Sequence, residues 1–500
     1  MKKLLCMILA LGLLAGCTAA PAQTTAPAET IPAVSVDSIA IRLSDEGVEF
    51  PADSGVYTAN DIIYYEEGHD ESYGEGEPGD AHSAEEAAAH TVVHITKPGT
   101  YTVSGKLSLG QIAVDLGEEA ENDPNAVVTL ILDGLDITCR VAPAIIFYNV
   151  YECGQPDGPA GANVILAPGS TNRVVGSHTE EYDGALYSRM SMNIGGEGLL
   201  RIEADNEGLC SEMHLTINGG DISIESGNDG INANEDGLSV ITINGGSLLV
   251  NVIGGTGEGD GIDSNGSIVI NGGTVQSYAC ATSGDSGIDA DLGIQINGGT
   301  VIATGNMLDR IEEGGQTYAV FQFAQSQHEL TWTLKDPWDS PVMECQTPND
   351  FSNLLFSSPA LTEGTYTLFS GDTRFMGAPA LGGFVGGFQP IERPDWPGRD
   401  DGDVEIPPQP TVEYEIQGGQ PPERPEDMPL GQPPEGSDPS RMPGGPMPDG
   451  SVEMPPVEMP EGVRPPQDGY QGVLIPSVAL TTDFAITQGA NYFYNVQAVK

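Results

Sequence analysis

The tripeptide Asn-Gly-Gly recurs four times between short apolar runs, and its asparagines are separated by 26, 27 and 26 residues. A β-hairpin meander would place varied turns about every 8–12 residues. One turn type that returns at a longer, fixed interval is typical of stacked coils. The chain is therefore predicted to be all-β, with parallel coils about 4.8 Å apart. The four copies cover residues 215–224, 241–250, 268–277 and 294–303.

Equivalent side chains of stacked coils are expected to form ladders. Apolar positions such as Ile217 and Ile243 alternate with polar ones and should point inward. An asparagine ladder at the corner can satisfy its amides from coil to coil, and the glycine pair supplies positive φ at the bend. The predicted structural ladder consists of Asn218, Asn244, Asn271 and Asn297. Weaker copies at 96–103, 130–137 and 164–171 predict N-terminal coils, the first of them as a cap.

A second motif, an acidic turn around Gly-Ile, follows the outgoing strand of each coil at 228–234, 259–265 and 285–291. Asp before Gly is also what a plain turn needs, but a turn alone does not explain the further acidic or amide positions in every copy. Stacked carboxylates repel when bare, and Ca²⁺ accepts six to eight oxygens in loose geometry. The predicted calcium ligands are Asp229, Asp260, Asp263, Asp285, Asp289, Asp291, Asn232, Asn234 and Asn265.

The composition supports this interpretation. The 66 glycines and 38 prolines suit tight turns rather than helices. The formal net charge is −55, which excludes a basic nucleic-acid-binding surface and favours divalent cations as counterions.

The first residues have the pattern of an export signal. Lys2 and Lys3 precede an apolar run over 4–14, which ends in Leu-Ala-Gly-Cys at 14–17. This ending resembles the bacterial lipobox, in which the cysteine, here Cys17, is diacylated and becomes the new N-terminus. We therefore expect a signal peptide at 1–16 and a lipid anchor on the outer face of the bacterial cell membrane. A plain secretory signal is the alternative.

The remaining cysteines show no metal-ligand spacing, and those within the repeat, Cys210 and Cys280, are expected to be small buried apolar residues. The export route permits a disulfide, but the spacing does not imply one. The five residues are Cys139, Cys153, Cys210, Cys280 and Cys345.

Four further segments follow the signal peptide. The Ala/Thr/Pro-rich residues 17–37 predict a flexible tether, and 38–376 the solenoid domain, closed at its C-terminal end by strands after residue 306. Residues 377–471 are rich in Pro, Gly and acids and predict a disordered insertion. Alternating residues within 472–500 predict strands that pack back on the solenoid.

Residues 95–105, 110–115 and 129–138, together with the lipobox, the Asn-Gly-Gly copies and the acidic turns, resemble secreted carbohydrate-binding parallel β-helix proteins of anaerobic bacteria. A polygalacturonate-binding member typifies that family. The resemblance covers roughly residues 38–376. It implies a right-handed parallel β-helix close to that of pectate lyases, bound calcium, and binding of acidic plant polysaccharide without established cleavage.

The acidic turns depart from that family, whose members commonly carry a basic residue where this chain has Asn232, Asp263 and Asp289. A uronate lyase needs a Lys or Arg base, and no lysine lies between Lys106 and Lys335. The sequence therefore favours a calcium-dependent surface lipoprotein that binds a uronic-acid polysaccharide and has no catalytic residue. A lyase-like enzyme and a structural or adhesive solenoid with calcium only as a staple remain alternatives. Aromatic residues are scarce in the repeat, and Tyr278 is the one candidate for stacking on a sugar.

Overall fold

The computed structural model describes residues 38–62, 84–179, 182–254, 259–328, 330–380 and 479–500, which belong to one compact unit. The expected signal peptide and tether, and nearly all of the expected 377–471 insertion, lie outside these residues. Within the described part, helix is limited to α1 (Ala84–Ala88) and the 3₁₀ helix η1 (Glu118–Asn122). No helix found there is long and apolar enough to cross a membrane. The described chain is all-β.

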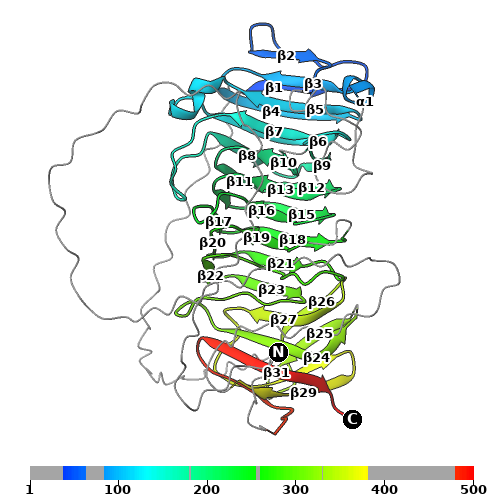
Figure 1. Ribbon diagram of the computed structural model, residues 1–500, viewed down its shortest axis with the longest axis vertical. Helices are drawn as coiled ribbons and strands as arrows, with labels where there is room; N and C mark the ends of the chain where they lie inside the picture. The colour runs from blue at the N-terminus through cyan, green and yellow to red at the C-terminus, as the bar shows by residue number, and fades with distance from the viewer. Residues whose placement is uncertain (1–37, 63–83, 180–181, 255–258, 329, 381–478) are drawn as a thin grey trace, which may run out of the picture. The chain divides into compact units, whose positions relative to one another are not determined.

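Most strands pair in parallel with a strand of the next coil and form three columns (Figure 1). The first column contains β1 (Ile39–Leu43), β8 (Ala162–Leu166), β11 (Met192–Gly196), β14 (Leu215–Ile217), β17 (Val240–Ile243), β20 (Ser267–Ile270) and β22 (Gly293–Ile296). The second contains β9 (Thr171–Gly176), β12 (Leu199–Ala204), β15 (Asp221–Ser226), β18 (Ser247–Val252), β21 (Thr274–Tyr278) and β23 (Thr300–Gly305). The long strands β4 (Gly99–Leu107) and β6 (Val128–Thr138) run through both columns.

The third column forms a separate sheet. It contains β2 (Val56–Ala59), β3 (Thr91–Ile95), β5 (Gly110–Asp115), β7 (Ile145–Asn149), β10 (Gly184–Ser188), β13 (Glu207–Ser211), β16 (Ile231–Ala233) and β19 (Ile262–Ser264). All neighbours in it are parallel except β2 and β3. Long parallel sheets on successive coils match the predicted solenoid, whereas its right-handed winding stays a prediction.

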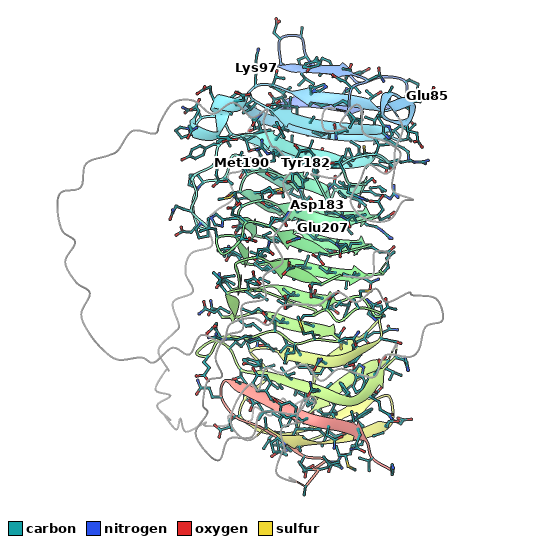
Figure 2. All side chains as sticks on the ribbon, viewed as in Figure 1. Glu85, Lys97, Tyr182, Asp183, Met190 and Glu207 are labelled. Atoms are coloured by element: carbon teal, nitrogen blue, oxygen red, sulfur yellow. The ribbon has the colours of Figure 1, made fainter. Side chains whose placement is uncertain are left out.

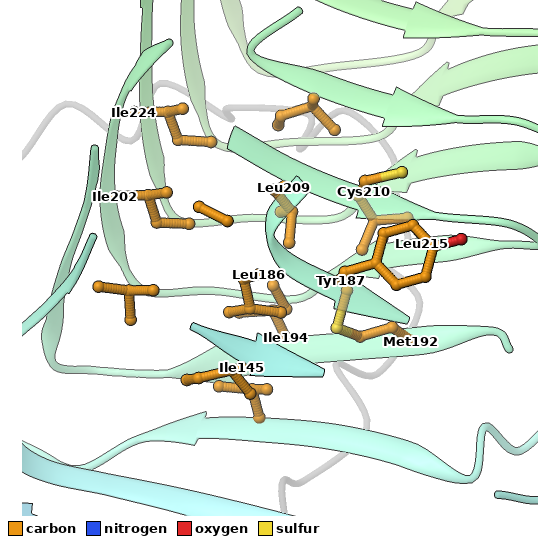
Figure 3. Packing of buried hydrophobic residues seen from close by; sticks show 14 of the residues in the cluster. Ile145, Leu186, Tyr187, Met192, Ile194, Ile202, Leu209, Cys210, Leu215 and Ile224 are labelled. Atoms are coloured by element: carbon orange, nitrogen blue, oxygen red, sulfur yellow. The ribbon is translucent and has the colours of Figure 1, made fainter. Parts of the chain in front are cut away.

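The interior is built from apolar ladders that follow the repeat. Ile217 pairs with Ile243, and Ile243 with Ile270, in strict register, and all are buried. Figure 3 shows the same arrangement nearer the N-terminus, where Ile202 stacks with Ile224 and Leu186 with Leu209. Because side chains alternate along a strand, one apolar residue in two suffices to fill this core.

The asparagine corner is a continuous chain of amide hydrogen bonds. Asn244 Nδ2 donates to Asn218 Oδ1, Asn271 Nδ2 to Asn244 Oδ1, and Asn297 Nδ2 to Asn271 Oδ1, each over 2.9 Å. The ladder lies on the exposed side of the corner. Its amides therefore join four successive coils side chain to side chain.

The two glycines of each corner have different structural roles. The sequence predicted positive φ for both. Only the second has positive φ, as at Gly246 with 89°. A Cβ on the first glycine would approach the preceding coil, since at Gly272 it would lie 2.7 Å from the Asn244 carbonyl oxygen. The first glycine is needed for close stacking and the second for the bend.

The parallel stack ends where the chain reverses direction. β27 (Phe351–Ser357) pairs antiparallel with β23 and with β24 (Tyr318–Gln327). β31 (Ala490–Ala498) pairs in parallel with β24 and antiparallel with β29 (Thr373–Pro379). The other strands of this region are β25 (Thr331–Lys335), β26 (Pro341–Gln346), β28 (Gly364–Ser370) and β30 (Phe484–Ile486). They enclose an aromatic core around Phe321, Trp332 and Phe356, so the last coil has no open edge at β23.

At the N-terminal end, β1 lies in parallel on β4 and β2 lies antiparallel on β3. The expected cap at 96–103 is therefore itself covered, and the end strands come from residues that precede it.

Candidate metal centre

The acidic turns enter the third column one above another. Asn232 of β16 pairs in register with Asp263 of β19. The third copy continues the stack without a strand of its own, because Asp289 N donates to Ile262 O over 2.8 Å and Ser264 N to Asp289 O over 3.3 Å. Asn232, Asp263 and Asp289 thus occupy the same position on successive coils.

Three of the nine predicted ligands form one group, which we call the aspartate cluster: Asp260, Asp263 and Asp289. One carboxylate oxygen of each lies within 4.8 Å of the others. Burial raises the pKa of Asp260 to about 10, that of Asp289 to about 7 and that of Asp263 to about 6. Repulsion from Asp229 adds to the shift at Asp260, and repulsion from Asp309 to that at Asp289. Without a cation, these carboxylates favour protonation.

Backbone amides fix the carboxylate of Asp260 and those of its neighbours Asp229 and Asp285. Asp260 N donates to Asp229 Oδ1 over 2.7 Å, and one coil later Ser286 N donates to Asp260 Oδ1 over 2.6 Å. A bond in the opposite direction runs from Gly259 N to Asp285 Oδ2, also 2.6 Å long. Each of these three carboxylates is therefore tied through one oxygen to a neighbouring coil.

The donor set fits a hard divalent cation. Oxygens that share a Ca²⁺ at its usual ligand distances are at most about 5 Å apart, and the cluster meets that limit. Asp289 Oδ1 is buried and has no hydrogen-bond partner among the described residues. An oxygen in that position is costly to leave unsatisfied, and a cation would satisfy it. Asp260, Asp263 and Asp289 are the residues that would hold calcium.

Three other predicted ligands act on the cluster from its edge. Asp229 and Asp285 bond to neighbouring backbone amides, and Asp291 is exposed, with its charge raising the pKa of Asp263 and Asp289. Asp229, Asp285 and Asp291 lie outside the group of three, and their role as calcium ligands stays a prediction.

The three asparagines lie elsewhere. Asn232 turns toward the preceding coil, where its Nδ2 donates to Glu207 Oε1 over 2.8 Å. Asn265 donates to the backbone oxygen of Asn234 over 2.7 Å, and Asn234 donates to Glu212 Oε1 over 3.4 Å. Asn234 and Asn265 therefore brace adjacent loops.

The structure adds acidic residues that the sequence did not single out. Asp309 is near Asp289 and Asp263, and its Oδ2 accepts a hydrogen bond from Ala290 N over 2.9 Å. Asp309 belongs to a loop that follows the last copy of the repeat, so the periodicity of the sequence could not identify it. A second group contains Asp183, Glu207 and Cys210. Their turns are earlier copies of the acidic motif, so the signal that would have found this group was present in the repeat.

Tyr278, the candidate for sugar stacking, and Arg201, an arginine on a coil strand, both have structural surroundings. Tyr278 is 1% exposed, and its hydroxyl donates to Gln276 Oε1 over 3.0 Å, which excludes it as a stacking platform. Arg201 pairs in register with Ser223 and binds Glu203 over 2.8 Å on the surface. Burial raises the pKa of Asp309, and the charge of Arg310 opposes this shift in part, while the Arg310 guanidinium binds Glu312 over 2.8 Å. Arg310 is the cation at the border of the cluster.

The five described cysteines are free thiols. Cys210 and Cys280 are buried, as the repeat predicts. No disulfide therefore joins coils within the described part of the chain.

Residues 89–323 match the family model of carbohydrate-binding domain-containing proteins. A carbohydrate-binding domain-containing protein of Acetivibrio thermocellus is 33% identical over 135 residues, which are 27% of this chain and 45% of that relative. The chain thus spans about half the length of this curated relative. A solved structure of a polysaccharide lyase-like protein from C. thermocellum, a gadolinium derivative, is 20% identical. It covers 53% of this chain and 90% of its own, with a TM-score of 0.34. The family match supports the resemblance to carbohydrate-binding proteins.

Proposed function

We propose that this protein binds an acidic polysaccharide in a calcium-dependent manner, through the aspartate cluster on the third strand column. The observation that carries the proposal is the cluster itself, three carboxylates within 4.8 Å of one another that come from two consecutive acidic turns. All three lie inside the segment that matches the carbohydrate-binding family, residues 89–323.

The chemistry of the cluster favours a uronic-acid glycan. The net charge of −55 repels a polyanion, so the glycan needs a bridging cation. Ca²⁺ takes six to eight oxygen ligands, and three carboxylates that each bind through one oxygen leave positions for a uronate carboxylate and hydroxyls. On this proposal calcium is shared between protein and glycan, and polygalacturonate is a fitting ligand to test.

We extend the proposal to the location of the protein. The Leu-Ala-Gly-Cys sequence at 14–17 supports export and a lipid on Cys17. A glycan-binding solenoid at the outer face of the membrane would meet its polymer outside the cell. Replacement of Cys17 by Ser is expected to move the protein from the detergent-soluble membrane fraction to the aqueous fraction. Full retention in the membrane fraction would contradict the anchor.

A lyase is the second candidate, and Arg310 is the observation that favours it. This arginine borders the cluster through Asp309, and a uronate β-elimination needs a base near a cation-bound carboxylate. The guanidinium of Arg310 forms an ion pair with Glu312, which competes with a role as the catalytic base. We therefore rank binding without cleavage first.

The proposal is tested by isothermal titration with polygalacturonate in calcium and in EDTA. Asp263→Asn keeps the size of the side chain but removes one anionic ligand. Loss of an outer partner of a metal site already costs roughly 10–100-fold in affinity, so this variant should bind at least tenfold more weakly. Asp221→Asn is the matched control, since Asp221 is an exposed aspartate of β15 outside the cluster.

Each result has a definite meaning. Equal binding in EDTA, or equal loss in both variants, would overturn the role of calcium at this cluster. Calcium binding without affinity for any uronate polymer would favour the structural solenoid. Release of unsaturated uronate, followed by its ultraviolet absorbance and abolished by Arg310→Ala, would establish the lyase instead.

A further inference from the structure

A second group of ligand-type side chains lies on the same column, nearer the N-terminus. Asp183 precedes β10, whereas Glu207 and Cys210 belong to β13, the next strand of the column. One carboxylate oxygen from each acid and the Cys210 sulfur lie within 4.8 Å of one another. Figure 2 labels Asp183 and Glu207 on successive coils, and Figure 3 shows Cys210 beside Tyr187.

Two members of this group, Glu207 and Cys210, occupy the same repeat positions as Asp260 and Asp263 of the aspartate cluster. Glu207 precedes Gly208 as Asp260 precedes Gly261. Cys210 pairs with Asn232, which in turn pairs with Asp263. Cys210 is thus the upstream counterpart of Asp263, whereas the third members differ: Asp183 lies on the coil before Glu207, and Asp289 on the coil after Asp260.

The upstream group holds an unsatisfied buried carboxylate. Glu207 is only 4% exposed. Its Oε1 accepts from Asn232 Nδ2, but its Oε2 is buried and has no hydrogen-bond partner in the described structure. Asn232 is 9% exposed, and its own Oδ1 is likewise without a partner. A buried carboxylate oxygen that lacks a donor carries its full desolvation cost.

The surroundings of this carboxylate are anionic. Burial raises the pKa of Glu207, and the charges of Asp183 and Asp229 raise it further. Burial also raises the pKa of the Cys210 thiol, and the charges of Glu207 and Asp183 raise it further. Hydrogen bonds from the Asn232 amide and the Cys210 thiol oppose the rise of the Glu207 pKa only in part. The group as it stands therefore favours a positive ligand.

We propose that Asp183, Glu207 and Cys210 form a second metal site, which takes a thiophilic divalent cation of the zinc class rather than calcium. Ca²⁺ is a hard cation that selects oxygen ligands, whereas Zn²⁺ binds cysteine thiolate together with carboxylates. Ligand atoms around a tetrahedral zinc are about 3.3–3.8 Å apart. Starting from separations of at most 4.8 Å, the three atoms would need to draw together by no more than about 1.5 Å, a change within the reach of side-chain torsions.

Metal binding there requires loss of the thiol proton, which passes to solvent as the S–metal bond forms. Asn232 is a positioning residue in this scheme, since its amide fixes Glu207 Oε1. The site joins the coil of Asp183 to that of Cys210. The column would thereby hold two cations of different chemical class, with the Cys210 thiol at the repeat position that the Asp263 carboxylate occupies in the calcium centre.

Cobalt(II) is the probe for the test, because it replaces zinc and gives a thiolate-to-metal charge-transfer band. The metal-free full chain should bind Co²⁺ with that band, and added Zn²⁺ should remove it. Cys210→Ser should abolish the band, and Asn232→Ala should weaken Co²⁺ binding roughly 10–100-fold. Cys280→Ser is the matched control, since Cys280 is also a buried free thiol of the repeat, and it should keep the band.

Two further variants separate this site from the calcium centre and from a failure to fold. Glu207→Gln preserves side-chain shape and should weaken Co²⁺ binding. Cys210→Asp should lose the band and gain binding of Tb³⁺, a luminescent calcium substitute. Asp263→Asn should leave the band intact, so the result is independent of glycan binding. A band that persists in Cys210→Ser, or a wild-type chain without one, would overturn the proposal.

Discussion

Asp229 Oδ1 accepts a hydrogen bond from the backbone nitrogen of Asp260, 2.7 Å away and 31 residues later in the chain. The same relationship recurs on the next coil between Asp260 and Ser286. The turns that stack the coils therefore also hold their carboxylates together. Burial and mutual repulsion raise the pKa values of Asp260 and Asp289 in this arrangement, so the acids favour protonation when no cation is bound.

Calcium is expected to stabilise the fold against heat and urea. A ligand that binds only the folded state at 100 times its dissociation constant adds about 2.7 kcal/mol to the free energy of unfolding. Thermal unfolding in EDTA and in calcium measures this difference. The shift should shrink strongly in Asp260→Asn and persist in Asp221→Asn. Identical melting curves with and without calcium in the wild type would contradict the prediction.

The metal-free protein should lose stability as the pH rises through the acid range. Burial raises the pKa of Asp289 from 3.8 to about 7, so between these values the folded state holds more protons than the unfolded state. The free energy of unfolding then falls as the pH rises. The contribution of Asp289 is fully present below its unfolded pKa and is lost as the pH passes its folded one.

Urea titrations of the wild type and Asp289→Asn in EDTA, from about pH 4 to about pH 8, isolate this group, because other carboxylates titrate in both proteins. The wild type should become less stable relative to the variant across that range. Added calcium should remove much of this pH-dependent loss of stability in the wild type. Parallel stability curves for the two proteins would show that Asp289 titrates normally.

The asparagine ladder should contribute most at its interior members. Asn271 both donates to Asn244 and accepts from Asn297, whereas Asn297 makes one described ladder bond. A net hydrogen bond contributes roughly 0.5–1.5 kcal/mol. Asn271→Ala should therefore lower the free energy of unfolding by about 1–3 kcal/mol and Asn297→Ala by about half as much. Equal effects in chemical denaturation would argue against a cooperative ladder.

Glycines with positive φ should differ according to their surroundings. Gly246 has a φ of 89°, and a Cβ there would lie 2.6 Å from the Gly220 carbonyl oxygen. Gly237 has a φ of 67° but open space around it. Gly237→Ala should cost roughly 1–2 kcal/mol from backbone strain alone. Gly246→Ala should cost clearly more, because the coils must also move apart. Thermal unfolding compares the two, and equal losses would contradict a steric role.

The repeat allowed the architecture to be predicted in some detail. Ile217, Ile243 and Ile270 stack as expected, because a strand-turn-strand unit of constant length places equivalent residues above one another. The C-terminal closure was harder to specify. β31 pairs with β24, yet their residues are far apart in the chain and share no period.

The candidate site was predicted only in part, for the same reason. Asp260, Asp263 and Asp289 were recognised because they recur in the acidic turn. Asp309 comes from a loop that has left the repeat. Asn232 has the spacing of a calcium ligand but bonds to Glu207 instead, and only the packing between coils decides which way its side chain turns.

The sequence by itself determined the stacking period, the apolar interior and the asparagine corner, because each depends on a local unit that repeats. Tertiary structure decided which oxygens and which sulfur come within 4.8 Å of one another. That depends on inter-coil register and burial, which set both the distance between carboxylates and the cost of leaving them charged. The periodic sequence predicts that the acidic residues stack along one strand column. Only the folded structure shows that they form two separate groups.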